Sequence, residues 1–130
     1  MKGRLYMSYM KLPHNHHNEI DTTMLLKQLD DIQHFQMVAE LFKQLSDPTR
    51  IRLFWLLCHC EECVLNISAM MKMTSPAISH HLRALRNKGL VSSRRVGKEV
   101  YYKSANTEQS MLLHKMIEKV LMITCPEHKE

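Results

Sequence analysis

The chain has 130 residues, enough for one domain with a sizeable hydrophobic core and too few for two. Its formal net charge of +5 and its pI of about 9.1 favour a polyanionic partner. No run of 18 apolar residues is present and the N-terminus has no signal-peptide core, so we expect a cytoplasmic protein without a membrane span. With only three glycines and dominant helical periodicity, the sequence predicts a mainly α fold with one small β-hairpin.

The first 21 residues show no regular pattern, and Pro13 blocks a helix there. We expect residues 1–21 to form a flexible leader and residues 22–130 to form the folded domain. The leader contains a short histidine cluster, His14, His16 and His17. An accessory metal-binding arm is the alternative interpretation of this cluster.

Apolar residues recur at helical spacing near both ends of the domain and predict long helices at Thr22–Leu45 and Thr107–Thr124. Both helices carry more apolar surface than one small core can cover. A second copy of the chain would cover the remainder, so we expect a homodimer. Between them, Asp47 as N-cap and Pro48 at the first helical position predict a buried helix that ends near Cys58.

The stretch Asn66–Gly89 predicts two helices joined by a tight turn. Ser75 is the expected N-cap of the second helix, and Gly89 the expected residue after its last turn. This second helix has an apolar stripe formed by Ile78, Leu82 and Leu85.

The opposite face of this second helix is polar and cationic, and no acidic residue occurs between Thr74 and Lys98. A short helix, a turn and a donor-rich second helix are typical of proteins that read the DNA major groove. An antiparallel helix pair with a solvated face is the alternative. The candidate DNA-binding residues here are Thr74, Ser75, Pro76, Ser79, His80, Arg83 and Arg86.

A hairpin is predicted directly after the helix pair, with strands at Leu90–Val91 and Val100–Tyr102 and a basic turn between them. Such a hairpin fits a wing that lies along a phosphate backbone. An ordinary hairpin whose cations protect a sheet edge is the alternative. The candidate phosphate contacts are Arg94, Arg95 and Lys98.

Three of the four cysteines lie within six positions, at Cys58, Cys60 and Cys63, and the fourth is Cys125. In a reducing compartment such spacing indicates metal or redox chemistry rather than a structural disulfide. Three interpretations stay open. The first is a site for a thiophilic ion, As(III), Cd²⁺, Pb²⁺ or Zn²⁺, with Cys125 as an optional further ligand. The others are a thiol redox or reactive-sulfur switch and inert, half-buried cysteines.

The segments LSDPTRIRLFWLL and SPAISHHLRALRNKGLVSSRRVGKEVYY, with their spacing, resemble the ArsR/SmtB family of metal-sensing repressors over about Ala39–Val120. The resemblance implies a homodimeric winged helix-turn-helix protein that binds double-stranded operator DNA and releases it when an inducer binds. It also implies that the Ser75–Arg86 helix reads DNA and that Arg94, Arg95 and Lys98 belong to the wing.

The family's two usual sensor sites match this sequence only in part. Of the family's ELCxC box, Cys63 matches the first cysteine, whereas Leu65 occupies the position of the second. On the terminal helix, Thr107 and Gln109 fall where an aspartate and a histidine are expected. His114 and Glu118 form an i, i+4 pair there, which the sequence alone indicates to be ordinary surface neighbours.

Two other classes of protein compete with a DNA-binding repressor. An enzyme is disfavoured, because no nucleophile elbow, P-loop, HExxH motif or paired catalytic carboxylates is present. A protein–protein adaptor with a winged fold is the remaining alternative, and only DNA binding separates it from a repressor.

Overall fold

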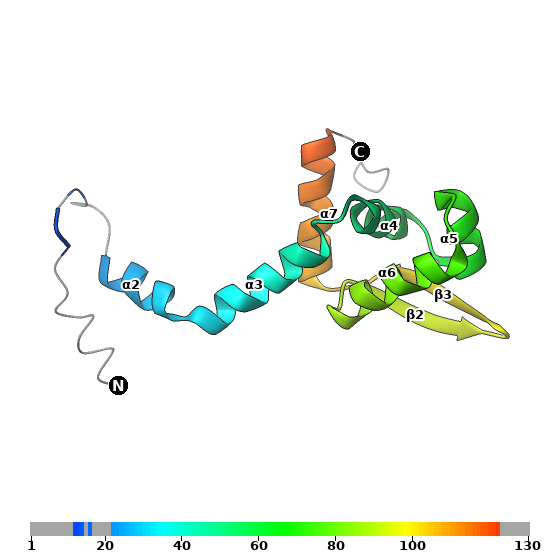
Figure 1. Ribbon diagram of the computed structural model, residues 1–130, viewed down its shortest axis with the longest axis horizontal. Coiled ribbons are helices and arrows are strands. Elements are labelled where there is room, and N and C mark those ends of the chain that lie inside the picture. Colours follow the sequence, from blue (N-terminus) through cyan, green and yellow to red (C-terminus); the bar gives the residue numbers. More distant parts are fainter. Residues whose placement is uncertain (1–11, 15, 17–21, 123–130) are drawn as a thin grey trace. The chain divides into compact units, whose positions relative to one another are not determined.

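The computed structural model describes residues 12–14, 16 and 22–122, and its contacts divide the chain into two compact units, residues 1–40 and 41–130. The described residues form six helices and three strands (Figure 1). In chain order they are α2 (Thr22–Asp30), α3 (Ile32–Gln44), α4 (Pro48–His59), β1 (Glu62–Cys63), α5 (Val64–Met71), α6 (Ser75–Asn87), β2 (Val91–Val96), β3 (Glu99–Ser104) and α7 (Glu108–Leu121).

The single helix predicted from Thr22 to Leu45 is wrong, because the chain leaves helical geometry at Asp31 and forms α2 and α3 instead. The backbone N–H of Asp31 donates to the carbonyl of Gln28 at 3.1 Å, and its carboxylate contacts Nδ1 of His34 in the first turn of α3. Aspartate favours helix starts over helix interiors, which explains the break. The expected excess of exposed apolar side chains is confirmed for Leu25, Leu29, Ile32, Phe35 and Phe42.

The hydrophobic core of the second unit is built around α4. Its start is confirmed as predicted: the Asp47 side chain accepts a hydrogen bond from the Thr49 backbone N–H at 2.8 Å, and Pro48 is the first helical residue. From α4, Leu53, Phe54 and Leu57 are buried. They pack with buried side chains of α5, α6, α7 and β2, among them Ile67, Ile78, Leu82, Leu85, Leu90, Val91 and Leu113.

The helix-turn-helix pair consists of α5 and α6, and the predicted N-cap of α6 is wrong by one residue. Thr74 is the cap, and its hydroxyl accepts from the Ala77 backbone N–H at 3.3 Å. Ser75 is therefore the first helical residue, and its hydroxyl lies 3.2 Å from that of Ser68 on α5. The predicted end is confirmed, since Gly89 adopts a positive φ of +71° directly after the helix.

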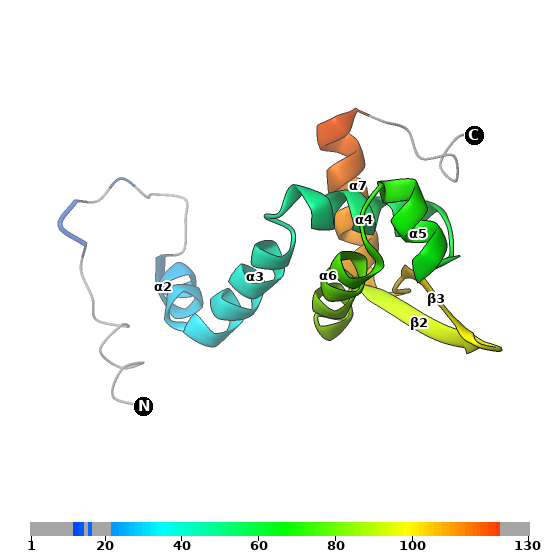
Figure 2. The same cartoon turned by 45° about the vertical axis from the view of Figure 1, so that its right-hand side comes forward.

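The wing is part of a three-stranded antiparallel sheet of order β1-β3-β2. The sequence predicted β2 and β3 but not β1, whose two residues pair with Tyr101 and Tyr102 of β3. The turn is only two residues long, Gly97–Lys98, and Gly97 has the positive φ of +63° that such a turn favours. Arg94 and Arg95 consequently lie in β2 and not in the turn as expected. The tip of the hairpin projects beyond the helices of this unit (Figure 2).

The last described helix, α7, begins as predicted with Thr107, whose hydroxyl accepts from the Ser110 backbone N–H at 3.2 Å. The buried Ser110 hydroxyl in turn donates to the Leu90 carbonyl at 3.1 Å and holds α7 on the sheet side of the core. The helix ends at Leu121, where Met122 adopts a left-handed conformation as the C-cap, so the predicted end at Thr124 is too late. The side of α7 that faces away from this core is apolar and exposed, with Met111, Leu112, Met116, Val120 and Leu121.

Candidate nucleic-acid interface and metal-binding groups

The outward face of α6 presents the residues predicted to contact DNA. Ile78, Leu82 and Leu85 are fully buried on the opposite side, so the helix is fixed in rotation about its axis. Thr74, Pro76, His80, Arg83 and Arg86 are exposed, whereas Ser75 and Ser79 are half-buried. The face can therefore offer an imidazole and two guanidinium groups to a ligand without any change of the core.

His81 connects α6 to α4 through a hydrogen bond with Arg50. Nε of Arg50 on α4 donates to Nδ1 of His81 at 3.2 Å, and Nη1 of Arg50 donates to Oε1 of Gln44 at 2.9 Å. Burial lowers the pKa of His81 below its ordinary value of 6.5, and the charges of Arg50 and His80 lower it further against the opposing effect of Asp47. The neutral imidazole is the form that accepts this hydrogen bond.

The wing cations differ from one another in their surroundings. Nε and Nη2 of Arg94 donate to the two carboxylate oxygens of Glu61 at 2.9 and 2.7 Å, and the guanidinium lies 5.7 Å from the centre of the Tyr101 ring. The hydrogen bond from Arg94 lowers the pKa of Glu61. Arg95 and Lys98 are exposed. Arg94 thus ties β2 to the residue before β1, while its charge is balanced within the protein.

The three clustered cysteines occupy different structural positions. Cys58 lies in the last turn of α4, Cys60 caps that helix, and buried Cys63 lies in β1 directly before α5. The Cys60 thiol donates to the Leu56 carbonyl at 3.5 Å, and burial together with the nearby Glu62 raises its pKa. The raised pKa disfavours the thiolate form of Cys60, which slows both thiolate ligation and oxidation.

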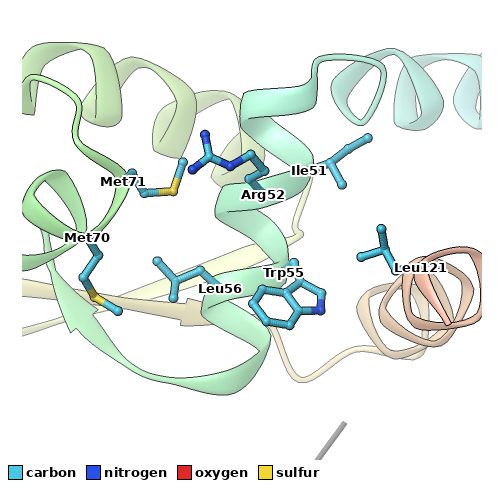
Figure 3. Close-up of a pocket in the computed structure, with 7 residues that line it drawn as sticks. All are labelled: Ile51, Arg52, Trp55, Leu56, Met70, Met71 and Leu121. Carbon is cyan, nitrogen blue, oxygen red and sulfur yellow. The ribbon is translucent and has the colours of Figure 1, made fainter. Parts of the chain in front are cut away.

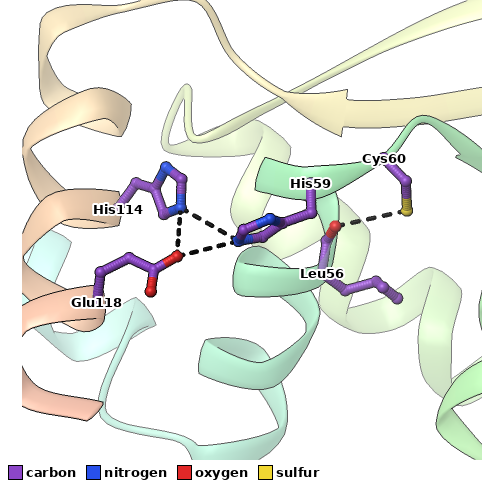
Figure 4. Close-up of polar contacts among 5 residues, drawn as sticks. All are labelled: Leu56, His59, Cys60, His114 and Glu118. Carbon is purple, nitrogen blue, oxygen red and sulfur yellow. Dashed lines mark hydrogen bonds and ion pairs between the residues drawn. The ribbon is translucent and has the colours of Figure 1, made fainter. Parts of the chain in front are cut away.

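A convergent set of ligand atoms is formed instead by His59, His114 and Glu118. It is the one group of three or more His, Cys, Asp or Glu ligand atoms in the described chain whose members all lie within 4.8 Å of one another. Nε2 of His59 lies 3.1 Å and Nε2 of His114 lies 3.2 Å from Oε1 of Glu118, and the two Nε2 atoms are 3.4 Å apart (Figure 4).

This triad corrects the interpretation of His114 and Glu118 as surface neighbours, because only 8% and 7% of these residues is exposed. Burial by itself raises the pKa of Glu118, but the hydrogen bonds with His114 and His59 outweigh it, and the pKa is lowered overall. The Trp55 ring lies against His59 with a centroid distance of 4.5 Å. Sequence reasoning missed the triad; its only signal was a histidine inside the cysteine cluster.

An apolar cavity of about 400 Å³ opens between α4, α5 and α7 (Figure 3). Arg52 contributes its one cationic group, and the buried Trp55 Nε1 at its edge has no hydrogen-bond partner in the structure. Its other lining residues are Ile51, Leu56, Met70, Met71 and Leu121.

Two groups suggested by the sequence cannot be placed. Cys125 and His17 lie outside the described residues. The rings of His14 and His16 stack with a centroid distance of 5.6 Å.

None of the described helices is long and apolar enough to cross a bilayer.

Comparison with known proteins gives a consistent match. A family model described as bacterial regulatory protein, arsR family, matches residues 47–93, which hold α4, the helix pair and the start of the wing. The chain is 48% identical over 71 residues to a transcriptional repressor SmtB homolog of Synechocystis, a match that covers 55% of this chain and 54% of the relative. It is 37% identical over 83 residues to the arsenic resistance transcriptional regulator ArsR2 of Pseudomonas putida, covering 63% of this chain and 71% of the relative.

Among solved structures, the chain is similar to the homodimeric winged helix-turn-helix DNA-binding domain of a possible ArsR-family regulator from Mycobacterium bovis. The TM-score is 0.63 at 30% identity, over 70% of this chain and 83% of that one. The predicted winged helix-turn-helix fold is therefore confirmed. The chain spans about half the length of the Synechocystis relative.

Proposed function

Because this chain belongs to the arsR family of bacterial regulatory proteins, we propose that it is a cytoplasmic, homodimeric transcriptional repressor that releases its operator when a metal or metalloid ion binds. The observation that carries the proposal is the face of α6. His80, Arg83 and Arg86 are exposed on a helix whose opposite stripe is fully buried. Such a helix enters a major groove without rearrangement, and its guanidinium groups match the acceptors of guanine.

The wing extends the same basic surface toward the phosphate backbone. Arg95 and Lys98 are exposed near the tip of the β2–β3 hairpin. Phosphate contacts fix the register of a protein on DNA and do not depend on base sequence. In this assignment α6 supplies sequence preference and the wing supplies affinity.

Self-association is supported by the apolar side of α7. Together with the end of α3 it borders a groove of about 290 Å³ lined by Phe42, Leu45, Ile51, Leu113, Met116, Ile117, Val120 and Leu121. An exposed apolar surface of this kind on a small regulator marks an interaction site. A second copy of the chain presents the same groove, so a two-fold contact covers both.

The inducer is proposed to be a metal or metalloid ion, since the relatives include regulators named for arsenic and cadmium resistance. Cys58, Cys60 and Cys63 stay our predicted ligands for a thiophilic ion of the As(III), Cd²⁺, Pb²⁺ or Zn²⁺ type. Their three positions in the fold mean that the backbone after Cys58 must rearrange for the sulfurs to converge. Thiol redox sensing by the same residues is the alternative.

The test is fluorescence anisotropy of a labelled duplex taken from the DNA upstream of the chain's own gene, with unlabelled competitor DNA. We expect the wild type to prefer this duplex, and Arg83→Ala to lose about fivefold or more of that preference, since a bidentate base contact contributes about 1–3 kcal/mol. Lys43→Ala is the matched control, because it removes an exposed cation from α3. Equal binding of all sequences by the wild type would support the adaptor alternative and refute a repressor.

A further inference from the structure

The His59–His114–Glu118 triad links two helices within one chain. His59 is the last residue of α4, whereas His114 and Glu118 lie one turn apart on α7 and point back toward it (Figure 4). The side chains are 17%, 11% and 9% exposed, respectively. Cys60 is directed toward Leu56 and away from the triad (Figure 4). Among the described residues, the donor set is therefore two imidazole nitrogens and one carboxylate oxygen, without sulfur.

The spacing of these three atoms matches the ligands of one metal ion. Zinc bonds to nitrogen and oxygen are about 2.0–2.1 Å long, so two neighbouring ligands of a tetrahedral ion lie about 3.3–3.4 Å apart. The measured separations are 3.1, 3.2 and 3.4 Å. A cation at their centre would need ligand movements of only a few tenths of an ångström.

Hydrogen bonding alone does not account for the arrangement. Both imidazoles lie within hydrogen-bond distance of the same oxygen, Oε1 of Glu118. If both Nε2–H groups donate to this oxygen, their hydrogens also approach each other, because the two Nε2 atoms are only 3.4 Å apart. The other oxygen, Oε2, is buried and has no hydrogen-bond partner among the described residues. A buried carboxylate oxygen left unsatisfied is costly, and a bound cation compensates a buried carboxylate directly.

We propose that His59, His114 and Glu118 form a site for a borderline divalent cation of the Zn²⁺ class, held within one protomer. Two histidines and one carboxylate are a donor set that binds zinc in proteins, whereas a trivalent arsenic ion prefers thiolates. The site differs from the thiol site in its ligands, and Zn²⁺ is the one ion of the thiol group that both donor sets can bind.

The position of the site also gives it a regulatory role, and this second step depends on the proposed repressor function. The cation joins α7, whose apolar side is the proposed dimer contact, to the end of α4. The start of α4 carries Arg50, which donates to His81 on α6. A cation that fixes α7 against α4 therefore fixes the orientation of the two recognition helices in the dimer. We expect occupancy to lower operator affinity.

The experiment begins with Co²⁺ and Zn²⁺ titrations of the reduced full chain in the absence of DNA. Co²⁺ should give the visible absorption of a tetrahedral ion, and Zn²⁺ should displace it. Glu118→Gln and His114→Gln should each weaken Zn²⁺ binding by more than about 100-fold. Substituting a residue that only hydrogen-bonds to a metal ligand already lowers metal affinity by about 10–100-fold, and these variants remove a ligand itself. Circular dichroism checks that both variants are folded. His34→Gln, which removes an exposed histidine of α3, should bind as the wild type does.

Two further measurements decide the assignment. In the wild type, Zn²⁺ should shift the ring ¹⁵N signals of His59 and His114, which requires no substitution. The Cys58→Ser/Cys60→Ser/Cys63→Ser variant, which lacks the proposed thiol site, should keep the visible bands of tetrahedral Co²⁺ at the triad and lose only sulfur-to-cobalt charge-transfer absorption. If that variant loses the visible bands while Glu118→Gln keeps them, the thiols hold the ion and the proposal is overturned.

The regulatory step has its own readout. Zn²⁺ should release wild-type protein from operator DNA and leave the Glu118→Gln complex intact. Release that is equal in both proteins overturns the regulatory role while the binding site stands. Absence of any specific DNA complex refutes the repressor function instead, and the metal titration without DNA is unaffected by that result.

Discussion

The wing allows a quantitative test of which cations contact phosphate. Each phosphate contact contributes about −0.9 to the slope of log affinity against log salt concentration. In a homodimer, Arg95→Gln removes two contacts, one from each wing, so the slope should become less negative by about 1.8. Between about 50 and 200 mM salt, a fourfold change, the loss of affinity should then be about 12-fold smaller than for the wild type.

Arg94 should behave differently because Glu61 balances its charge through two hydrogen bonds of 2.9 and 2.7 Å. The double variant Glu61→Gln/Arg94→Gln removes one positive and one negative charge from the wing. We expect its salt slope to equal that of the wild type, with thermal unfolding confirming that the sheet is intact. The assay is anisotropy of the upstream duplex at five or more salt concentrations. A slope reduced by about 1.8 in the double variant would refute this reasoning and assign Arg94 to the phosphates.

Three other predictions follow from α6 and its surroundings. His80→Ala should reduce the preference among related operator sequences more than overall affinity, as measured by competition with base-substituted duplexes; the reverse pattern would contradict its base-reading role. Thr74→Ala should lower the free energy of unfolding by about 1 kcal/mol through loss of the N-cap, as measured by urea denaturation, whereas an unchanged midpoint would contradict the capping assignment. Because the pKa of His81 is lower in the folded chain than its ordinary 6.5, the unfolded chain binds more protons just below pH 6.5, and stability should fall as the pH drops through that value. His81→Gln should reduce this loss in denaturation curves between about pH 5 and pH 7, and an identical pH dependence of both proteins would contradict it.

The fold was predictable because its signals are local. Asp47 before Pro48, the stripe of Ile78, Leu82 and Leu85, and Gly89 after it each fix a helix boundary or a buried face, and the structure agrees. The errors concern equally local competition. Asp31 interrupts a long apolar pattern and separates α2 from α3, and Thr74 competes with Ser75 for the cap of α6.

The triad was not predictable for a different reason. On α7 the most apolar residues are exposed and face away from the core of their own unit. The apolar pattern in the sequence therefore indicated the wrong side of the helix as the buried one. The inward side carries Ser110, Leu113, His114 and Glu118 instead. His59 is 55 residues from His114 and 59 from Glu118 along the chain. Its contact with α7 results from tertiary packing, which the residue spacing in the sequence does not reveal. The cysteines, by contrast, were conspicuous in the sequence because they are close together along the chain.

The most direct test of the central claim is metal-dependent release of the operator. The reduced full chain, bound to the labelled upstream duplex, is titrated separately with Zn²⁺, Cd²⁺ and As(III) while anisotropy is recorded. The account predicts that at least one ion returns the anisotropy to that of free DNA. To lower the population of the DNA-binding conformation from about 99% to about 1%, that ion must bind the released conformation more tightly by roughly 5.5 kcal/mol. Anisotropy that stays at the bound value with all three ions at saturation would contradict the account.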